Sequence, residues 1–209
     1  MARPATDIRI RLVHAARAQF LALGVDGASL REIAARARTS LGMIHYYFPT
    51  KDDLFFAVVE EIYGQLLADL EGALVAGPPV VERLRALFRR LAALTPDEQD
   101  IVRLVVREAL VSSARRDRLI ARFLRGHVPL VLGLLDEGVR TGLLKERVPL
   151  PLLLISTFAL AGPPQVVARQ VGARLGKAFP SGEKLADALL EVLLKGVGVP
   201  TPARPRRKG

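Results

Sequence analysis

Apolar residues recur every three to four positions along most of this chain, which is the spacing of amphipathic helices. The first such pattern covers residues 7–23 and is closed by Gly24, a residue type that commonly ends a helix. A longer pattern covers residues 51–74 and is ended by the Gly-Pro-Pro sequence at 77–79. The sequence contains no alternating strand pattern and no internal repeat, so it predicts an all-α protein.

Further helical patterns follow along the chain, at residues 80–94, 97–113, 115–141, 149–161, 165–175 and 182–197, and the Gly-Pro-Pro sequence at 162–164 separates the fourth from the fifth. Pro129 is expected to divide the third of these near His127, because proline cannot continue a helix. In the last helix one face is expected to carry Leu185, Leu189, Val192, Leu193 and Gly196. Residues 1–6 are expected to form a loose arm that contains a proline.

Two short helical patterns joined by a tight turn occupy residues 29–48. Ser29 is placed to cap the first helix, and Glu32 three residues later completes the capping-box pattern. Ser40 is placed to cap the second helix. Two helices of this length, separated by about three or four residues, predict a helix-turn-helix, whose second helix enters the major groove of DNA.

The second of these helices presents a surface without acidic residues. Its inward-facing residues are expected to be Ile44, Tyr47 and Phe48, and its opposite face carries Leu41, Gly42, Met43, His45 and Tyr46. Gly42 allows a close approach to a phosphate backbone, because it has no Cβ atom. Lys51 is unfavourably placed for the dipole of the following helix, and a nearby phosphate would offset this.

A set of correctly spaced residues in this region is typical of one known family: Ala16, Phe20, Gly24, Ser29, Ile33, Ala34, Ser40, Gly42, Tyr47, Phe48, Lys51 and Leu54. In this register residues 9–54 resemble the DNA-binding domain of a TetR-family transcriptional regulator. Three positions differ from the usual pattern of this family: Arg38 lies where Gly is common, Thr39 where Val is favoured and His45 where Tyr is favoured. Arg38 is therefore expected to alter the turn and to add a cation near the DNA.

The resemblance implies three parts of the chain. These are a DNA-binding domain at residues 1–51, a helical effector-binding and dimerisation domain at 52–199, and a basic tail at 200–209. In this family the last two helices pair with those of a second copy; ordinary core helices in a monomer are the alternative. Two-fold symmetry would present two reading heads to half-sites about 34–36 Å apart, or a multiple of that.

Charge is concentrated where DNA binding is expected. The 209 residues carry a net charge of +10, and residues 1–51 hold eight basic and three acidic side chains. A polyanion suits this excess, because neutralised phosphates release counterions. The charge alone would also fit a non-specific DNA-compacting protein, which remains the main alternative function. There is no cysteine, and residues 1–11 lack the apolar segment of a secretory signal, so a cytoplasmic protein is expected.

Catalytic chemistry is not expected from this sequence. Its histidines, His14, His45 and His127, lie on three separate elements without metal-ligand spacing, and no phosphate-loop or GxSxG motif occurs. The acidic pairs at 52–53 and 60–61 are explained by helix dipoles and solvation. We therefore predict neither an enzyme nor a cofactor nor a metal site. A helical small-molecule-binding protein or enzyme is a less favoured alternative.

The predicted function is that of a dimeric transcriptional regulator, most simply a repressor, which a small lipophilic effector releases from a palindromic operator. The predicted DNA contacts are Arg38, Thr39, Ser40, Leu41, Gly42, Met43, His45, Tyr46, Tyr47 and Lys51. Among them Met43 and Tyr46 are expected to contact bases. Polar residues within otherwise apolar helices are the candidate effector ligands: Arg103, Arg107, Glu108, Ser112, His127 and Thr157. Each of these also fits a structural or surface role.

Overall fold

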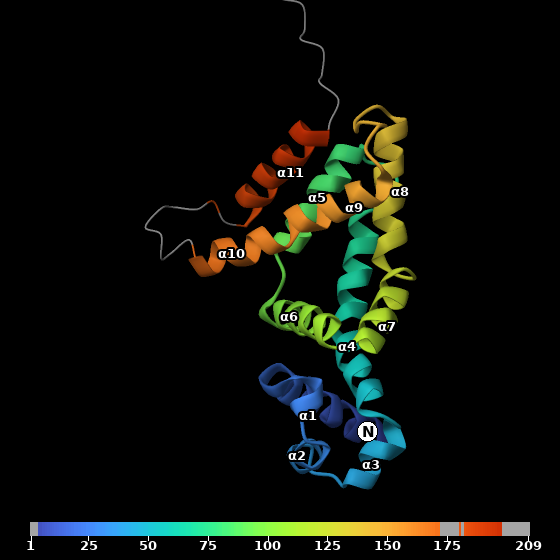
Figure 1. Ribbon diagram of the computed structural model, residues 1–209, viewed down its shortest axis with the longest axis vertical. Helices are drawn as coiled ribbons and strands as arrows, with labels where there is room; N and C mark the ends of the chain where they lie inside the picture. The colour runs from blue at the N-terminus through green and yellow to red at the C-terminus, as the bar shows by residue number, and fades with distance from the viewer. Residues whose placement is uncertain (1–3, 172–179, 181, 198–209) are drawn as a thin grey trace, which may run out of the picture. The chain divides into compact units, whose positions relative to one another are not determined.

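The computed structural model of the protein describes residues 4–171, 180 and 182–197 and is built from helices (Figure 1). The helices are α1 (Pro4–Gly27), α2 (Leu30–Arg36), α3 (Leu41–Tyr47), α4 (Lys51–Ala73), α5 (Val80–Ala92), α6 (Pro96–Val111), α7 (Ser113–Phe123), α8 (His127–Arg140), α9 (Leu150–Ala161), α10 (Pro163–Val171) and α11 (Glu183–Val197). No β-strand occurs within the described ranges. The predicted all-α fold, with an N-terminal helix-turn-helix followed by further helices, is confirmed.

The chain forms two compact units. The first unit comprises Met1–Ala68 and Thr95–Leu124, and the second comprises Asp69–Leu94 and Arg125–Gly209. The first unit thus joins α6 and α7 to the three N-terminal helices and most of α4. A functional division at residues 51/52 and 199/200 stays a prediction.

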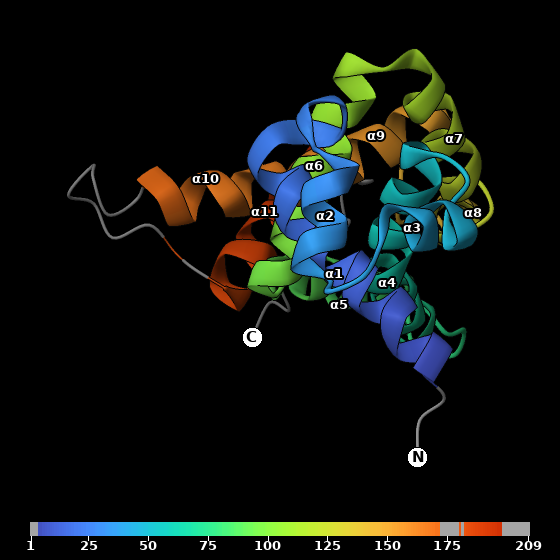
Figure 2. The same cartoon turned by 90° about the horizontal axis from the view of Figure 1, so that it is seen from below.

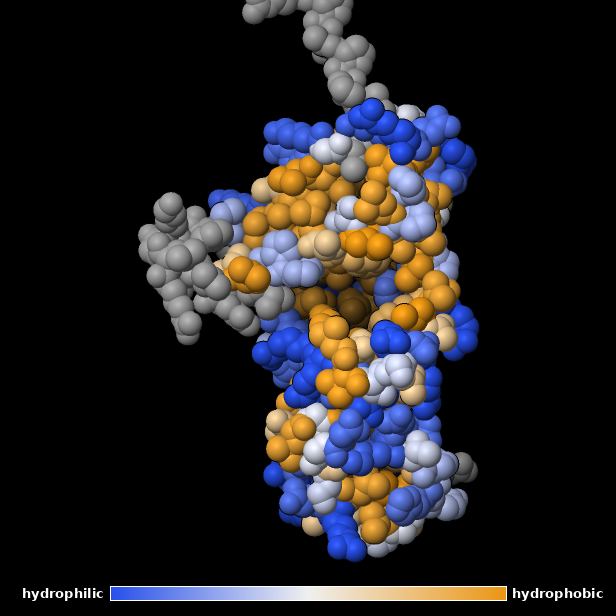
Figure 3. Space-filling view, in the orientation of Figure 1, coloured by the Kyte–Doolittle hydropathy of each residue, from blue (hydrophilic) through white to orange (hydrophobic). Residues whose placement is uncertain are grey.

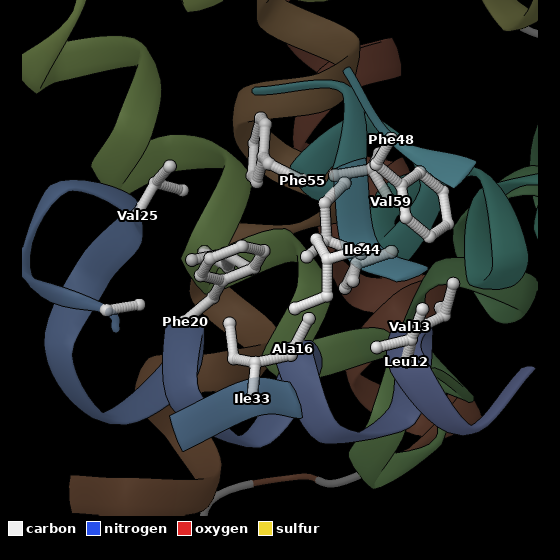
Figure 4. Packing of buried hydrophobic residues seen from close by; sticks show 14 of the residues in the cluster. Leu12, Val13, Ala16, Phe20, Val25, Ile33, Ile44, Phe48, Phe55 and Val59 are labelled. Carbon is white, nitrogen blue, oxygen red and sulfur yellow. The ribbon is translucent and has the colours of Figure 1, made fainter. Parts of the chain in front are cut away.

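An apolar core holds the N-terminal helices of the first unit together (Figure 4). Leu12, Ala16 and Phe20 follow each other at one-turn spacing on α1 and are fully buried. Phe20 meets Phe55 of α4 edge to face, with ring centroids 6.3 Å apart. Ile33 of α2 and Ile44 of α3 bury their side chains in the same core. Each short helix is therefore stabilised by this shared core rather than by its own length.

α7 is fastened to α4 by arginines that pair with acidic residues of α4. Arg118 lies 3.2 Å from Asp53, and its guanidinium stacks over Phe56 at 4.0 Å from the ring centroid. Arg122 binds Glu60 with two hydrogen bonds of 2.6 and 2.8 Å. The sequence explained the acidic pairs of α4 by the helix dipole and solvation. In the structure Asp53 and Glu60 of these pairs also bind α7, some sixty residues away.

The second unit is assembled around α5, which packs against α8, α9 and α11. Arg89 of α5 binds the Asp187 carboxylate of α11 with hydrogen bonds of 3.1 and 2.7 Å. Of the face predicted for α11, Leu185 and Leu193 are buried, whereas Val192 is 57% exposed and Gly196 is also exposed. Packing on α5 and α9 therefore covers only part of this face.

Most predicted helix boundaries are confirmed within a few residues. The loose arm is wrong at its inner end, because helix α1 already begins at Pro4, and proline suits a first helical turn. The division near His127 is confirmed, and Pro129 lies in the first turn of α8. The predicted helix end at residue 175 and the predicted basic tail at 200–209 fall outside the described residues. None of the described helices is long and apolar enough to cross a membrane.

Candidate DNA-binding surface

α3 is a short helix held between a polar cap and the core. The Ser40 hydroxyl accepts a hydrogen bond from the Met43 N–H at 3.3 Å, which satisfies one of the free amides of the first turn. At the other end Phe48 is 4% exposed and Ile44 is 1% exposed. The cap and the two buried side chains set the orientation of α3, as the sequence predicted.

The opposite face of α3 is open to solvent. Gly42 and His45 are exposed, and Tyr46 is 77% exposed although it is a large aromatic residue. α2 and α3 lie at one end of the first unit, and Figure 2 looks onto this end. An exposed tyrosine beside a glycine, with no acid on the helix, is suited to contacts with bases and phosphates. The two other apolar candidates, Leu41 and Met43, are half-buried.

Tyr47 lies at the edge between the outer face and the core. Its side chain is half-buried and packs on the hydrophobic core. Its ring also meets that of Tyr46 edge to face, with centroids 5.1 Å apart. Tyr47 therefore supports the exposed ring of its neighbour whether or not its own hydroxyl reaches a phosphate.

The turn between α2 and α3 is closed by a residue in the left-handed backbone region. Arg38 has φ of 51°, the only positive φ of a non-glycine residue in the described chain. Its N–H bonds to the Ala35 carbonyl and the Thr39 N–H bonds to the Ala34 carbonyl, the hydrogen-bond pattern of a Schellman motif. The expectation that Arg38 alters the turn is wrong, because arginine adopts the conformation that favours glycine. Its exposed guanidinium adds the expected cation.

Lys51 has partners within the protein. Its Nζ donates to the Asp26 carbonyl at the end of α1 at 3.1 Å and to the Ala28 carbonyl in the α1–α2 connection at 2.9 Å. These acceptors already offset the charge of Lys51 at the start of α4, which was the physical reason for expecting a phosphate there. Lys51 thus fixes the connection that leads into the helix-turn-helix, and one N–H of its ammonium is left for a phosphate.

Two exposed cations of α2 were not among the predicted contacts. Arg31 and Arg36 lie outside the buried stripe of α2, and neither forms an ion pair with another described residue. A helical wheel of α2 would have revealed them, because Ile33, Ala34 and Ala37 mark the inner face. They extend the positive surface from α3 onto α2. The Glu32 carboxylate of the predicted capping box instead accepts a hydrogen bond from Gln19 at 3.1 Å.

A charge cluster around the buried Arg115 and Glu108 attaches the end of α1 to α6 and α7. Arg115 is 4% exposed and makes two hydrogen bonds to Asp26, of 3.0 and 2.7 Å, and one to Asp52 of 3.1 Å. Its Nη2 also lies 3.1 Å from Glu108. The hydrogen bonds to Arg115 lower the pKa of the Asp26 carboxyl below its usual value. The connection before α2 is thereby tied to three different helices.

α6 also supplies hydrogen-bond partners on both sides of a break in α1. Gly24 has φ of 78°, so the regular helix ends there as predicted. Arg107 donates to the Phe20 and Leu21 carbonyls before the break. Glu108 accepts from the Val25 N–H after it, at 3.1 Å. These two neighbouring residues therefore satisfy backbone groups that the interrupted helix leaves open.

The candidate effector residues have different surroundings within their own units. Arg103 and Arg107 line the same groove beside α1, whereas Glu108 is buried in the charge cluster. Ser112 caps α7 by accepting from the Arg115 N–H at 3.3 Å. His127 and Thr157 belong to the second unit, where Thr157 is buried and donates to the Leu153 carbonyl at 2.7 Å. His127 packs its ring against Phe158 at 5.2 Å.

Comparison with known proteins matches the N-terminal helices to one family. Residues 12–58 match the model for bacterial regulatory proteins of the tetR family. A fatty acid metabolism regulator protein of Bacillus subtilis is 24% identical over 123 residues, which cover 59% of this chain and 63% of that protein. The match thus spans less than two thirds of that relative.

Two further similarities extend over almost the whole chain. A helix-turn-helix transcriptional repressor of Streptomyces coelicolor is 25% identical over 189 residues, covering 90% of this chain and 94% of that protein. The crystal structure of the regulator FadR from Bacillus subtilis, in complex with stearoyl-CoA, has a TM-score of 0.70 and 21% identity. It covers 90% of this chain and 98% of that one, and at this identity it shows a shared fold.

Proposed function

The chain belongs to the TetR family of transcriptional regulators, and from this premise we propose that it is a repressor that binds a two-fold symmetric operator as a homodimer. The supporting observation is the outer face of α3. This face combines an exposed Tyr46 with Gly42 and His45, on a helix whose other side is anchored by Ile44 and Phe48. A rigid helix with an acid-free exposed face is what reading a major groove requires.

Phosphate contacts on either side of α3 complete the proposed interface. Arg38 precedes the helix, Lys51 follows it, and Arg31 and Arg36 add cations from α2. Such contacts position the head on the duplex, while base contacts from α3 give sequence preference. We assign the base contacts to Tyr46 and Met43, the phosphate contacts to Ser40, Gly42, Tyr47 and Lys51, and either role to His45. Thr39 and Leu41 adjoin these contacts at the start of α3.

Dimerisation through the last helices is supported by apolar side chains that the second unit leaves exposed. Leu152 and Ile155 of α9 lie one turn apart and are 52% and 65% exposed. Val167 of α10 and Val192 of α11 are exposed to a similar degree. Hydrophobic residues gather over α9 on the face seen in Figure 3. Exposed apolar patches of this kind mark interaction surfaces, and a second copy would present a symmetric operator with two heads.

A small effector with a lipophilic part is the proposed release signal. Two of the comparisons support this class: the similar Bacillus subtilis protein is a fatty acid metabolism regulator, and the similar FadR structure contains stearoyl-CoA. Such an effector would shift the population between DNA-binding and released states. A coupling free energy of about 1–3 kcal/mol corresponds to a change in operator affinity of roughly 5- to 150-fold.

Selection of bound duplexes from a random pool tests the proposed function. We expect a two-fold symmetric consensus, which the protein prefers over random duplex by roughly a thousandfold or more. Tyr46→Ala is the diagnostic variant, and Tyr63→Phe, on the core side of α4, is a matched aromatic control. Equal binding of all sequences would identify a non-specific DNA-binding protein instead and would refute the regulator.

A further inference from the structure

α1 and α6 of the first unit enclose a groove that none of the proposed DNA contacts lines. Its volume is about 540 Å³, within the range of small-molecule sites, roughly 300–1,000 Å³. Its lining, from α1 and then from α6, is Ala18, Leu21, Ala22, Asp100, Arg103, Leu104 and Arg107. On both helices these positions follow the three- and four-residue spacing of a single face. We call this space the α1–α6 groove (helices in Figure 1).

The floor of the α1–α6 groove is apolar because α1 contributes small side chains there. Ala18 and Ala22 are exposed and lie one turn apart, with Leu21 beside them. Leu104 of α6 is 2% exposed and closes the floor from the other side. Two methyl groups opposite a helix leave room that larger residues would fill. The floor therefore suits a short hydrocarbon body.

The rim of the groove carries two arginines and one acid. Arg103 is paired with Asp100 three residues earlier, and the Arg103 side chain is 62% exposed. Exposed pairs of this kind are weak, so a better anion can displace Asp100. Arg107 lies one turn further, and its buried Nε has no hydrogen-bond partner, although it is 3.3 Å from the Glu108 carboxylate. Two guanidiniums beside an apolar floor are complementary to a planar carboxylate.

The groove is also connected to the DNA-binding head through Arg107. The same guanidinium that lines the groove donates to the Phe20 and Leu21 carbonyls at the end of the regular part of α1. Leu21 itself lines the groove. A ligand that recruits Arg107 would therefore compete with the contacts that hold α1 next to the break at Gly24. Occupancy of the groove would therefore change how strongly α6 is attached to α1.

We propose that the α1–α6 groove binds a small monocarboxylate with an apolar body, of the size of a medium-chain fatty acid. Arg103 and Arg107 hold the carboxylate, and Ala18, Ala22 and Leu104 contact the hydrocarbon. Binding weakens the hold of Arg107 on α1 and so lowers DNA affinity; this second part rests on the proposed regulator function. All the residues that line the groove belong to the first unit.

Calorimetric titration of the full chain without DNA tests the site. The probes are octanoate below its micelle concentration, 1-octanol and octylammonium, which share a chain and differ in charge. We expect saturable octanoate binding that is at least about tenfold tighter than binding of either other probe, because charged hydrogen bonds contribute most of the discrimination. Equal affinity for octanoate and 1-octanol, or no saturable octanoate binding, would overturn the site.

Variants at exposed positions distinguish this groove from any other place on the molecule. Arg103→Gln should weaken octanoate binding about tenfold, and Ala22→Leu should abolish it by filling the floor. Arg116→Gln and Ala114→Leu make the same changes at exposed positions of α7, away from the groove, and should bind like the original chain. Unchanged thermal unfolding will show that all four variants fold. If Ala22→Leu binds as well as Ala114→Leu does, the ligand does not occupy the groove.

The second part is tested with a duplex selected by the protein itself. Octanoate should lower the affinity for this duplex in the original chain and leave it unchanged in Ala22→Leu. If octanoate binds but the DNA affinity stays constant, the connection through Arg107 is refuted while the site stands. If no duplex is selected, the regulator function fails, and the calorimetric result still decides whether the groove binds a carboxylate.

Discussion

The positive φ of Arg38 allows backbone strain and DNA binding to be separated at one residue. An L-residue in the left-handed region costs about 1–2 kcal/mol, and Arg38 has φ of 51° in the turn before α3. Arg38→Gly removes this cost but gives the unfolded chain more freedom, which takes back about 0.4–1 kcal/mol. We therefore expect Arg38→Gly to stabilise the fold by roughly 0.5–1 kcal/mol.

Arg38→Ala is the control variant for Arg38→Gly. Alanine also removes the cation but keeps the strain of a side chain at positive φ, so its stability should stay close to that of the original chain. Urea unfolding gives the free energies, and the melting temperature should follow by about 2–4 °C per kcal/mol. If Arg38→Gly is no more stable than Arg38→Ala, the explanation of the turn is wrong.

DNA binding should respond to both substitutions alike. Each removes one proposed phosphate contact, so the slope of log affinity against log salt should fall by about 0.9 for each copy of the chain on the duplex. Arg38→Lys keeps the charge and should preserve the slope. A slope that is unchanged in both Arg38→Gly and Arg38→Ala would remove Arg38 from the interface. The structure thus predicts a variant that is more stable and binds DNA less tightly.

Four further outcomes follow from the structure. Tyr46→Ala should lose about 1–3 kcal/mol of preference for the selected duplex in fluorescence anisotropy, with unfolding changed by less than about 0.5 kcal/mol; retained preference would contradict its role. Ile155→Asp should convert the proposed dimer to a monomer in light scattering, and an unchanged dimeric mass would contradict an interface at α9. Arg115→Met removes a shared partner of Asp26, Asp52 and the buried Glu108, and should cost about 1–3 kcal/mol in urea unfolding; a loss below about 0.5 kcal/mol would contradict this. Because the pKa of Asp26 is lower in the folded state, its stabilisation is present above the unfolded pKa and is lost as pH falls below about 4. Asp26→Asn should therefore show a smaller loss of stability between pH 5 and pH 3, and equal losses would contradict this.

Features of the fold that depend on short stretches of sequence were predictable. Ser29 and Ser40 cap their helices as expected, and the break at Gly24 lies where the pattern placed it. The buried Ile44 and Phe48 and the exposed His45 and Tyr46 of α3 also followed from spacing, whereas Leu41, predicted on the outer face, packs on the core. Caps, breaks and faces are set by residues three or four positions apart, so a single sequence contains the whole signal.

The predictions were wrong or incomplete where the local sequence was compatible with more than one arrangement of side chains or backbone. Of the apolar face predicted for α11, packing on α5 and α9 buries Leu185 and Leu193 and leaves Val192 exposed. At Arg38 the sequence suggested a changed turn, yet the hydrogen bonds of the Schellman motif outweigh the strain of one arginine. The hydrogen bonds of Lys51 to two backbone carbonyls could not be predicted from a helical pattern, because the acceptors are distant in the sequence.

The sequence by itself determined the class of the protein, the limits of its helices and the face of α3 that is free to meet DNA. Only the tertiary structure decided how the end of α1 is attached to α6 and α7, because these contacts join residues far apart in the chain. Glu108 meets Val25 across 83 positions, and Arg115 meets Asp26 across 89. The α1–α6 groove has the same origin, since it forms where two distant helix faces pack and small side chains leave space. Local patterns encode which side of a helix is apolar, but not which helix will cover it.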